Sequence, residues 1–183
     1  LLSTHNLPAR YLELEVTEGF IIDNAERAAA IIDNLHKLRV SVSLDDFGTG
    51  YSSLSYLKRW RVDKLKIDRS FIRDVVTDPN DFAIVSAIVA IARQMQIEVV
   101  AEGIEGYPQV QKLLPLGCRY GQGYLFAKPQ LAEHCASFLQ ASVAKPRDVQ
   151  DLLSQILLGG ADVGAAAQPG SVATGRRRMT GPR

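Results

Sequence analysis

Short stretches in which hydrophobic and polar residues alternate recur along the first 140 residues of the chain. This period of two is typical of β-strands. It predicts strands over Tyr11–Val16, Val40–Asp46, Val62–Asp68 and Ile97–Ala101, and a weaker strand over Cys118–Gly123. Because most of these stretches end in a charged or amide side chain, polar groups are expected where the strands leave the core.

Hydrophobic residues at helical spacing fill the intervals between the predicted strands. They predict helices over 24–38, 78–96, 108–114 and 131–139, and a short helix that begins near Ser52. Asp78-Pro79 fits an N-cap followed by a proline in the first helical turn. Strand and helix therefore alternate about five times, with crossovers long enough for right-handed parallel β-α-β units.

Two parallel architectures fit this alternation: an open doubly wound sheet and a closed (β/α)8 barrel of the TIM type. The polar residues at the strand ends distinguish them, because in a barrel every strand ends at one common mouth. A doubly wound sheet usually carries a glycine-rich phosphate turn after its first strand, and the sequence contains no G-x-G-x-x-G. The barrel is favoured. The polar strand-end residues are Glu15, Asp45, Asp46, Lys66, Glu102 and Gln122.

The length of the chain limits how much of a barrel it contains. A complete barrel of this type takes about 250 residues, so the folded part predicts an N-terminally truncated barrel with about five of the eight strands. The chain begins at Leu1 without methionine, and we expect the true N-terminus to lie upstream. We expect a partial barrel domain over residues 1–140, a helical extension over 141–158 and a disordered basic tail over 159–183.

Composition excludes several other classes of protein. The chain has 183 residues, 46% hydrophobic content and a net charge of +1, which is typical of a soluble domain that binds no DNA. No apolar run approaches the length of a membrane span, and no signal peptide is visible, so we expect a cytoplasmic protein. Cys118 and Cys135 are then expected to be buried, reduced thiols. The Arg176–Arg178 run is expected to be a solvated tail.

The stretch from Val42 to Ser53 contains the strongest chemical signal. A short strand ends in the adjacent carboxylates Asp45 and Asp46, and two glycines and several hydroxyl side chains follow. Adjacent side chains alternate on a strand, but at a frayed end both carboxylates can reach one site if a cation offsets their repulsion. Gly48 and Gly50 allow the next loop to fold over that site.

The polar strand ends together predict an oxygen-rich metal site. Carboxylates favour Mg²⁺ or Mn²⁺ rather than zinc, and the three histidines show no ligand spacing. A shared carboxylate such as Asp45 can bridge two cations about 4 Å apart, an arrangement that promotes in-line attack of water on a phosphodiester. Lys66 then offsets phosphate charge, helps to orient the water, or forms a structural ion pair with Asp45 or Glu102.

Residues 46–48 also match the D-F-G metal-binding triplet of protein kinases. That interpretation fails on context, because the sequence contains neither H-R-D-x-x-x-x-N upstream nor a V-A-I-K strand.

Five motifs in order resemble the EAL domain family. They are L-E-V-T-E at 14–18, L-D-D-F-G-T-G-Y-S-S at 44–53, L-K-I-D-R-S-F-I at 65–72, V-V-A-E-G-I-E at 99–105 and G-Q-G-Y-L-F-A-K-P at 121–129. The resemblance implies a (β/α)8 barrel that hydrolyses cyclic di-GMP to linear pGpG with Mg²⁺ or Mn²⁺, as part of bacterial second-messenger signalling.

The resemblance also implies roles for individual residues. Glu15 and Asp45 would bind a first metal, and Asp45, Asp46 and Glu102 a second. Lys66 and Gln122 would contact the hydrolytic water or the scissile region. The supporting residues would be Glu18, which would brace the glycine loop, together with Glu105 and Asp68.

The sequence also departs from the family pattern. The Glu-Ala-Leu motif, an arginine that follows it and an asparagine ligand on a later strand are absent from these 183 residues. The first metal would therefore lack two protein ligands, and the sheet would have open edges. Arg119 stands where the family commonly has an acidic residue.

Three interpretations follow from these observations. The first is the C-terminal part of a cyclic di-GMP phosphodiesterase that follows sensory or cyclase-like domains and forms a homodimer near the helix after the glycine loop. The second is a non-catalytic module that binds cyclic di-GMP or another protein. The third is an inactive fragment.

Overall fold

Five short strands form one parallel sheet in the described part of the chain. The computed structural model describes residues 2–23, 25–50, 57 and 59–144. The strands are β1 (Glu13–Thr17), β2 (Ser41–Phe47), β3 (Lys64–Ile67), β4 (Glu98–Ala101) and β5 (Tyr120–Gly121). All four neighbouring pairs are parallel.

The order of the strands decides between the two predicted architectures. The sheet order is β1-β2-β3-β4-β5, so each strand lies beside the strands that precede and follow it in sequence. A doubly wound sheet reverses its order at a switch point, whereas a barrel adds each strand on the same side of the last. The sheet is therefore an arc of five barrel strands, as predicted, and β1 and β5 are its edges among the described residues.

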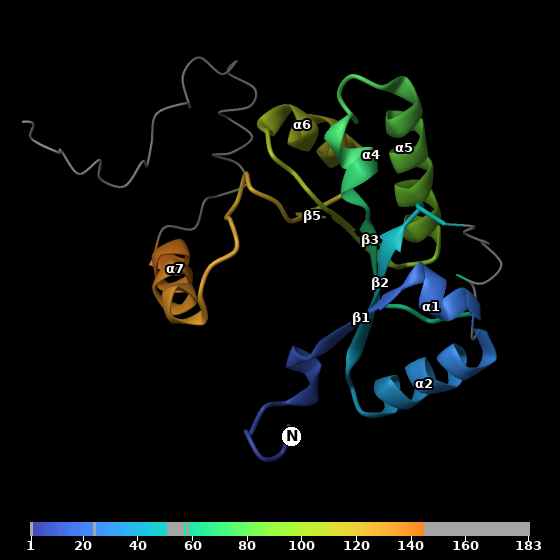
Figure 1. The fold of residues 1–183 in the computed structure, drawn as a ribbon, viewed down its shortest axis with the longest axis vertical. Coiled ribbons are helices and arrows are strands. Elements are labelled where there is room, and N and C mark those ends of the chain that lie inside the picture. Colours follow the sequence, from blue (N-terminus) through green and yellow to red (C-terminus); the bar gives the residue numbers. More distant parts are fainter. Residues whose placement is uncertain (1, 24, 51–56, 58, 145–183) are drawn as a thin grey trace, which may run out of the picture. The chain divides into compact units, whose positions relative to one another are not determined.

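The helices that lie between strands in the sequence cover one face of the sheet (Figure 1). A 3-10 turn over Ala9–Tyr11 precedes β1. The helices are α1 (Glu18–Asp23), α2 (Ala25–Lys37), α4 (Arg69–Arg73), α5 (Pro79–Gln94), α6 (Tyr107–Leu116) and α7 (Ala132–Ala144). The chain divides into two units, Leu1–His134 and Cys135–Arg183, and all five strands belong to the first. No helix in the described ranges is long and apolar enough to cross a membrane.

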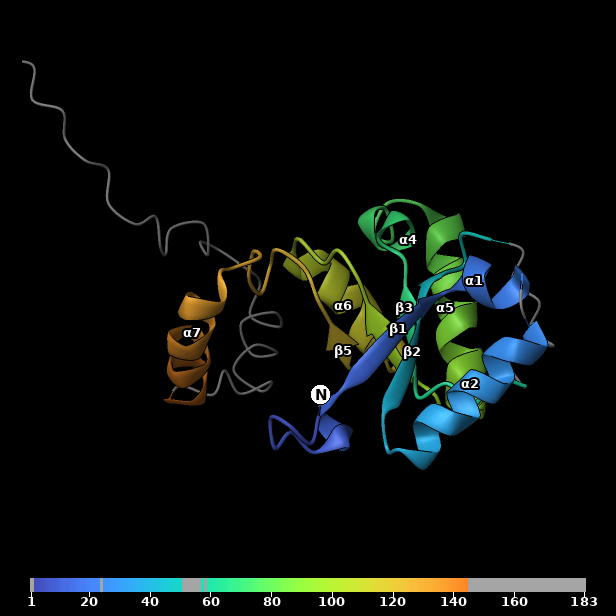
Figure 2. The ribbon, with the colours of Figure 1, turned by 60° about the horizontal axis from the view of Figure 1, so that its bottom comes forward.

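The covered face of the sheet is the hydrophobic core. Val42, Leu44, Leu65 and Ile67 alternate with polar residues on β2 and β3, and each is 1% exposed or less. Figure 2 shows α2 and α5 on the same side of these strands, and α2 contacts β2 while α5 contacts β3 and β4. Because side chains alternate along a strand, the polar residues of β1 to β3 must lie on the opposite face, which is the inner face of a barrel.

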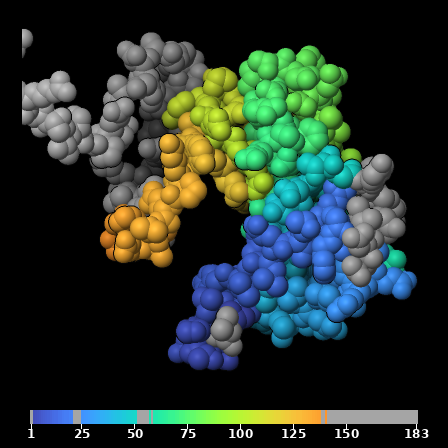
Figure 3. All heavy atoms as spheres, viewed as in Figure 1, coloured from blue at the N-terminus to red at the C-terminus, as the bar shows by residue number. Residues whose placement is uncertain are grey.

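The segments from β1 to α5 pack as one continuous body in the space-filling view (Figure 3).

Asp78 caps α5 as predicted, since its side chain accepts a hydrogen bond from the backbone N–H of Asn80. Gly117 ends α6 in the left-handed conformation with φ 98°, which glycine adopts without strain.

Two helices were missed by the sequence patterns. Helices α1 and α4 contain six and five residues, too few for a hydrophobic period to repeat. Asp68 was a usable signal for α4, because its side chain accepts a hydrogen bond from the N–H of Ser70 at 2.9 Å and caps the helix.

Other predictions need correction or lie outside the described residues. Cys118 is buried as expected, but Cys135 is exposed on α7, so the prediction of two buried thiols is wrong for Cys135. The predicted short helix near Ser52, with the dimer surface expected beside it, lies outside the described ranges. The same holds for the helix expected within 141–158, beyond residue 144, and for the tail over 159–183.

Candidate metal centre

A β-bulge in β2 brings two adjacent carboxylates to one site. Leu44 pairs with Leu65 and Phe47 with Ile67, so β2 advances three residues while β3 advances two. The extra residue is Asp46, whose φ of 55° lies in the left-handed region that Asp tolerates better than most residues. The bulge interrupts the alternation of side chains, as the sequence suggested for the end of this strand.

The acidic side chains of β2 and β4 meet at the C-terminal ends of their strands. One oxygen from each of Asp45, Asp46 and Glu102 lies within 4.8 Å of the others. Asp45 and Glu102 are partly buried and Asp46 is exposed. Three carboxylates this close repel one another, and a divalent cation that takes only oxygen ligands offsets that repulsion. The donor set therefore fits Mg²⁺ or Mn²⁺.

Lys66 on β3 lies beside this cluster and contacts three carboxylates. Its Nζ atom is 2.8 Å from Glu102 Oε1, 2.9 Å from Glu15 Oε1 and 3.0 Å from Asp45 Oδ1. The Lys66 residue is only 6% exposed. The structural ion pair with Asp45 or Glu102, one of the alternatives that the sequence left open for Lys66, is present with both residues, and Glu15 is joined to the cluster through the same ammonium group.

The surroundings shift two pKa values in this cluster. Burial alone would lower the pKa of Lys66, but its hydrogen bonds with Glu102, Glu15 and Asp45 outweigh burial and raise the pKa. Burial raises the pKa of Glu102, and its hydrogen bond with Lys66 offsets only part of this effect. Lys66 is therefore fully charged at neutral pH, and the pKa of Glu102 lies above the usual value of a glutamate.

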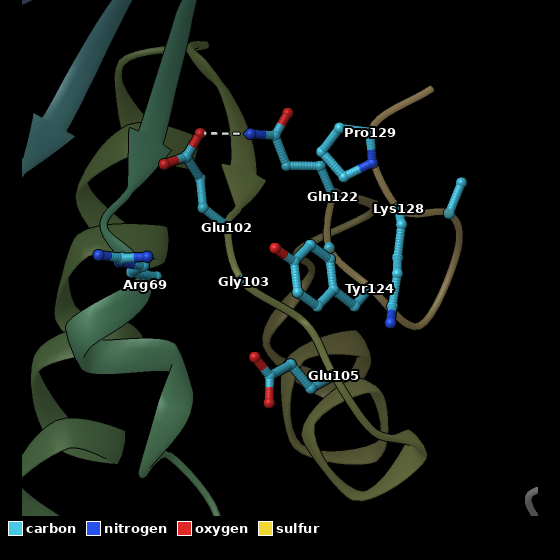
Figure 4. A pocket seen from close by; sticks show the side chains of 10 residues that line it. Arg69, Glu102, Gly103, Glu105, Gln122, Tyr124, Lys128 and Pro129 are labelled. Carbon is cyan, nitrogen blue, oxygen red and sulfur yellow. Dashed lines mark hydrogen bonds between the residues drawn. The ribbon is translucent and has the colours of Figure 1, made fainter. Parts of the chain in front are cut away.

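Gln122, just after β5, holds Glu102 from the other side. Its Nε2 donates a hydrogen bond to Glu102 Oε1 at 2.6 Å (Figure 4). Lys66 contacts the same oxygen, so both donors meet Oε1. The predicted neighbours Lys66, Glu102 and Gln122 are thus in direct contact, although they come from three different strand ends.

The supporting residues have different positions. Glu18 is 4% exposed, and its carboxylate lies against Gly50, where an added Cβ would be 3.3 Å from Glu18 Cδ. Neither of its oxygens has a hydrogen-bond partner among the described residues. Glu105 lines a pocket next to Glu102, whereas Asp68 caps α4.

A pocket of about 460 Å³ opens beside the cluster (Figure 4). Glu102 and Gln122 line it together with Arg69, Tyr124 and Lys128, which the sequence interpretation quoted within motifs but did not assign to the site. Lys128 Nζ lies 5.7 Å from the centre of the Tyr124 ring. An aromatic ring with two cationic side chains suits an aromatic, negatively charged ligand.

Backbone geometry on the floor of this pocket depends on Gly103. Its φ is 70°, and a Cβ added there would lie 2.6 Å from Arg69 Cβ. Only glycine adopts this conformation without strain and also admits the first residue of α4 so closely. The V-V-A-E-G motif thus places Glu102 directly before an obligatory turn.

Comparison with known proteins identifies the family of this chain. The EAL domain matches residues 1–129. The chain is 47% identical over 140 residues to the bifunctional diguanylate cyclase/cyclic di-GMP phosphodiesterase MucR of Pseudomonas aeruginosa. The matched segment covers 76% of this chain and 20% of MucR. The chain therefore spans about a fifth of the length of that relative.

Two solved structures show the same fold. The PaMucR phosphodiesterase in complex with c-di-GMP superposes with a TM-score of 0.70 at 46% identity, over 73% of this chain and 54% of that one. BlrP1 of Klebsiella pneumoniae, in a manganese/cy-diGMP complex, superposes with a TM-score of 0.66 at 34% identity, over 70% of this chain and 33% of that one. The arc of five strands with its acidic strand ends thus belongs to a member of the EAL domain family.

Proposed function

We propose that this chain supplies the C-terminal part of a cyclic di-GMP phosphodiesterase that produces linear pGpG. The observation that carries the proposal is the convergence of Asp45, Asp46 and Glu102 within 4.8 Å, beside the buried Lys66. The named relatives act on or bind cyclic di-GMP, and one was solved with manganese. A cytoplasmic homodimer preceded by sensory or cyclase-like domains is part of the same proposal.

In this proposal Asp45, Asp46 and Glu102 hold a divalent cation, Mg²⁺ or Mn²⁺, and Glu15 with Asp45 hold a second one. When bound, such cations stabilise negative charge on the phosphodiester and favour ionisation of the attacking water. Lys66 places a positive charge at the same site, and Gln122 fixes the orientation of the Glu102 carboxylate. The pocket lined by Arg69 and Tyr124 accepts the part of the dinucleotide next to the scissile bond.

The direct test is to incubate the chain with cyclic di-GMP and Mg²⁺ or Mn²⁺ and to measure pGpG by chromatography. We expect Glu15→Ala and Asp45→Ala to reduce turnover at least 100-fold, which is the order of loss when a group that stabilises the transition state is removed. The matched control is Asp33→Ala on the exposed face of α2, which should retain the wild-type rate. Undiminished turnover in both site variants would show that the assignment is wrong.

A non-catalytic binding module is the second candidate. One observation favours it: Glu15 does not belong to the group of three close carboxylates, and 51% of its side chain is exposed on the edge strand β1. The chain on its own then holds one cation well and a second one poorly. If cyclic di-GMP binds with micromolar affinity by calorimetry while no pGpG forms, the binding module is correct and the enzyme proposal fails for this chain.

A further inference from the structure

Two ion pairs of the same kind lie one above the other on the inner face of the sheet. Lys64 and Lys66 are two residues apart on β3 and therefore point to the same face. Each contacts a glutamate of β1: Lys64 Nζ lies 2.5 Å from Glu13 Oε2, and Lys66 Nζ lies 2.9 Å from Glu15 Oε1. The pair of Glu15 and Lys66, the upper pair, touches the acidic cluster. The pair of Glu13 and Lys64, the lower pair, has no part in the proposed chemistry.

Both pairs cross over β2, because β1 and β3 are its two neighbours in the sheet (Figure 1). Ser43 lies under this crossing, in register with Glu15 on one side and Lys64 on the other. It is fully buried and its side chain is short, so the long glutamate and lysine side chains can meet above it. A branched or aromatic residue at this position would occupy the space that the crossing needs.

The lower pair matters for the upper one because, among the described residues, β1 pairs with β2 only. Side-chain contacts therefore add to the few hydrogen bonds that set the position of β1. Glu13 and Lys64 are about one third exposed, and their contact is a charge-assisted hydrogen bond, which is stronger than a neutral one. The hydrogen bond with Glu13, more than any other interaction, raises the pKa of Lys64.

We infer that Glu13 and Lys64 form a positioning pair that holds β1 at the level where Glu15 reaches the Lys66 ammonium. Without the lower pair, β1 shifts or opens and Glu15 releases Lys66. Lys66 then keeps only its contacts with Asp45 and Glu102, and its charge, no longer shared with Glu15, competes more strongly with a cation for their oxygens. The consequence for metal binding rests on the proposed function, whereas the consequence for the position of β1 does not.

The experiment compares Lys64→Met with the wild type in two measurements. The first is the affinity for Mn²⁺ by calorimetry, for which we expect a loss of about 10-fold, the lower end of the effect of residues that orient metal ligands. The second is the rate of hydrogen exchange at the amides of β1, measured without metal. We expect this rate to rise about 10-fold, because β1 opens more often without the lower pair. The matched control is Lys37→Met on the exposed surface of α2, which should change neither quantity.

The sign of the affinity change separates positioning from electrostatics. Lys64→Met removes a positive charge near the site, and charge alone would strengthen Mn²⁺ binding. Positioning predicts weaker binding. Lys64→Arg keeps the charge and can still reach Glu13, so it should restore most of the affinity. Glu98 and Tyr120 also face Lys64 from β4 and β5, and therefore Glu13→Gln should have a smaller effect than Lys64→Met.

Glu13→Gln keeps the shape of the side chain and serves as the second variant if Lys64→Met does not fold. The double variant should bind Mn²⁺ no more weakly than Lys64→Met alone, because the two residues act as one unit. Unchanged exchange of the β1 amides in both single variants would overturn the inference. If the wild type binds no Mn²⁺ but exchange accelerates in the variants, the positioning pair stands and the proposed function fails.

Discussion

Lys66 Nζ lies 2.8 Å from Glu102 Oε1, and this contact joins β3 to β4 at the centre of the candidate site. The same nitrogen also reaches Glu15 and Asp45, so one buried ammonium group contacts carboxylates from three strand ends and offsets part of their negative charge. In the proposed function the same three carboxylates take part in holding the cations. Lys66 therefore reduces the repulsion between the carboxylates, and it also weakens their attraction for a cation.

Replacing Lys66 with Met should change metal affinity and turnover in opposite directions. The variant keeps a long apolar side chain but leaves the carboxylates with uncompensated negative charge, which attracts a divalent cation more strongly. We expect tighter Mn²⁺ binding by calorimetry, and turnover of cyclic di-GMP about 100-fold lower because a positive charge near the phosphodiester is lost. Weaker Mn²⁺ binding in Lys66→Met would contradict this account.

Asp46 allows charge and backbone conformation to be separated. Its φ of 55° is tolerated by Asn but strains Ala, at a cost of about 1 kcal/mol. We expect Asp46→Asn to retain the free energy of unfolding measured with urea and to lose about 10-fold in Mn²⁺ affinity, since one charged ligand is removed. Asp46→Ala should lose both Mn²⁺ affinity and free energy of unfolding.

A variant in which Asp46→Asn bound Mn²⁺ like the wild type would remove Asp46 from the proposed ligands. Asp33→Asn, on the exposed surface of α2, is the control for a change of net charge alone.

Gly103→Ala should destabilise the fold and distort the pocket. The added Cβ would lie 2.6 Å from Arg69 Cβ, and the φ of 70° is strained for alanine. We expect a loss of about 2 kcal/mol in the free energy of unfolding. The control is Gly19→Ala in α1, where nothing lies within 4 Å of the new Cβ. There alanine should stabilise the helix by about 0.5 kcal/mol. Equal stabilities of the two variants would disprove the steric argument.

Cys118 should make the fold less stable at alkaline pH. Burial raises the pKa of its thiol from 9.0 to about 11. The folded state therefore holds this proton more tightly than the unfolded state. The stabilising contribution is complete below pH 9 and is lost as the pH rises towards 11, by up to about 1.4 kcal/mol per pH unit. Cys118→Ala should show a shallower decline in this window in urea unfolding, and identical slopes would refute the assignment.

The sequence patterns identified most of the fold because the strands and long helices carry repeated periods. The helix from Pro79 and its cap at Asp78, for example, are fully visible in the sequence. The five-residue helix α4 is not, because one turn is too short to show a period. Its capping residue Asp68 was instead considered a supporting site residue, and the structure shows that the same carboxylate caps a helix.

The candidate site was predicted to a similar extent. Asp45, Asp46, Lys66, Glu102 and Gln122 come together as the motifs implied, whereas Glu15 reaches the group only through Lys66. Tyr124 and Arg69 were missed as pocket residues, although both stand inside the motifs that identified the family. They line the same pocket because β3 and β5 flank β4 in the sheet, and neither sequence position reveals that neighbourhood.

The sequence by itself determined the order of elements, the residue types of the candidate site and the family, because these depend on residue types and local periods. The tertiary structure decided which side of the sheet the polar residues share, how a bulge turns Asp46 towards Asp45, and which carboxylates one lysine can reach. Those features depend on strand register and on contacts between residues far apart in sequence. A one-residue shift of pairing would reverse every side chain of a strand, and only packing of the buried face fixes that register.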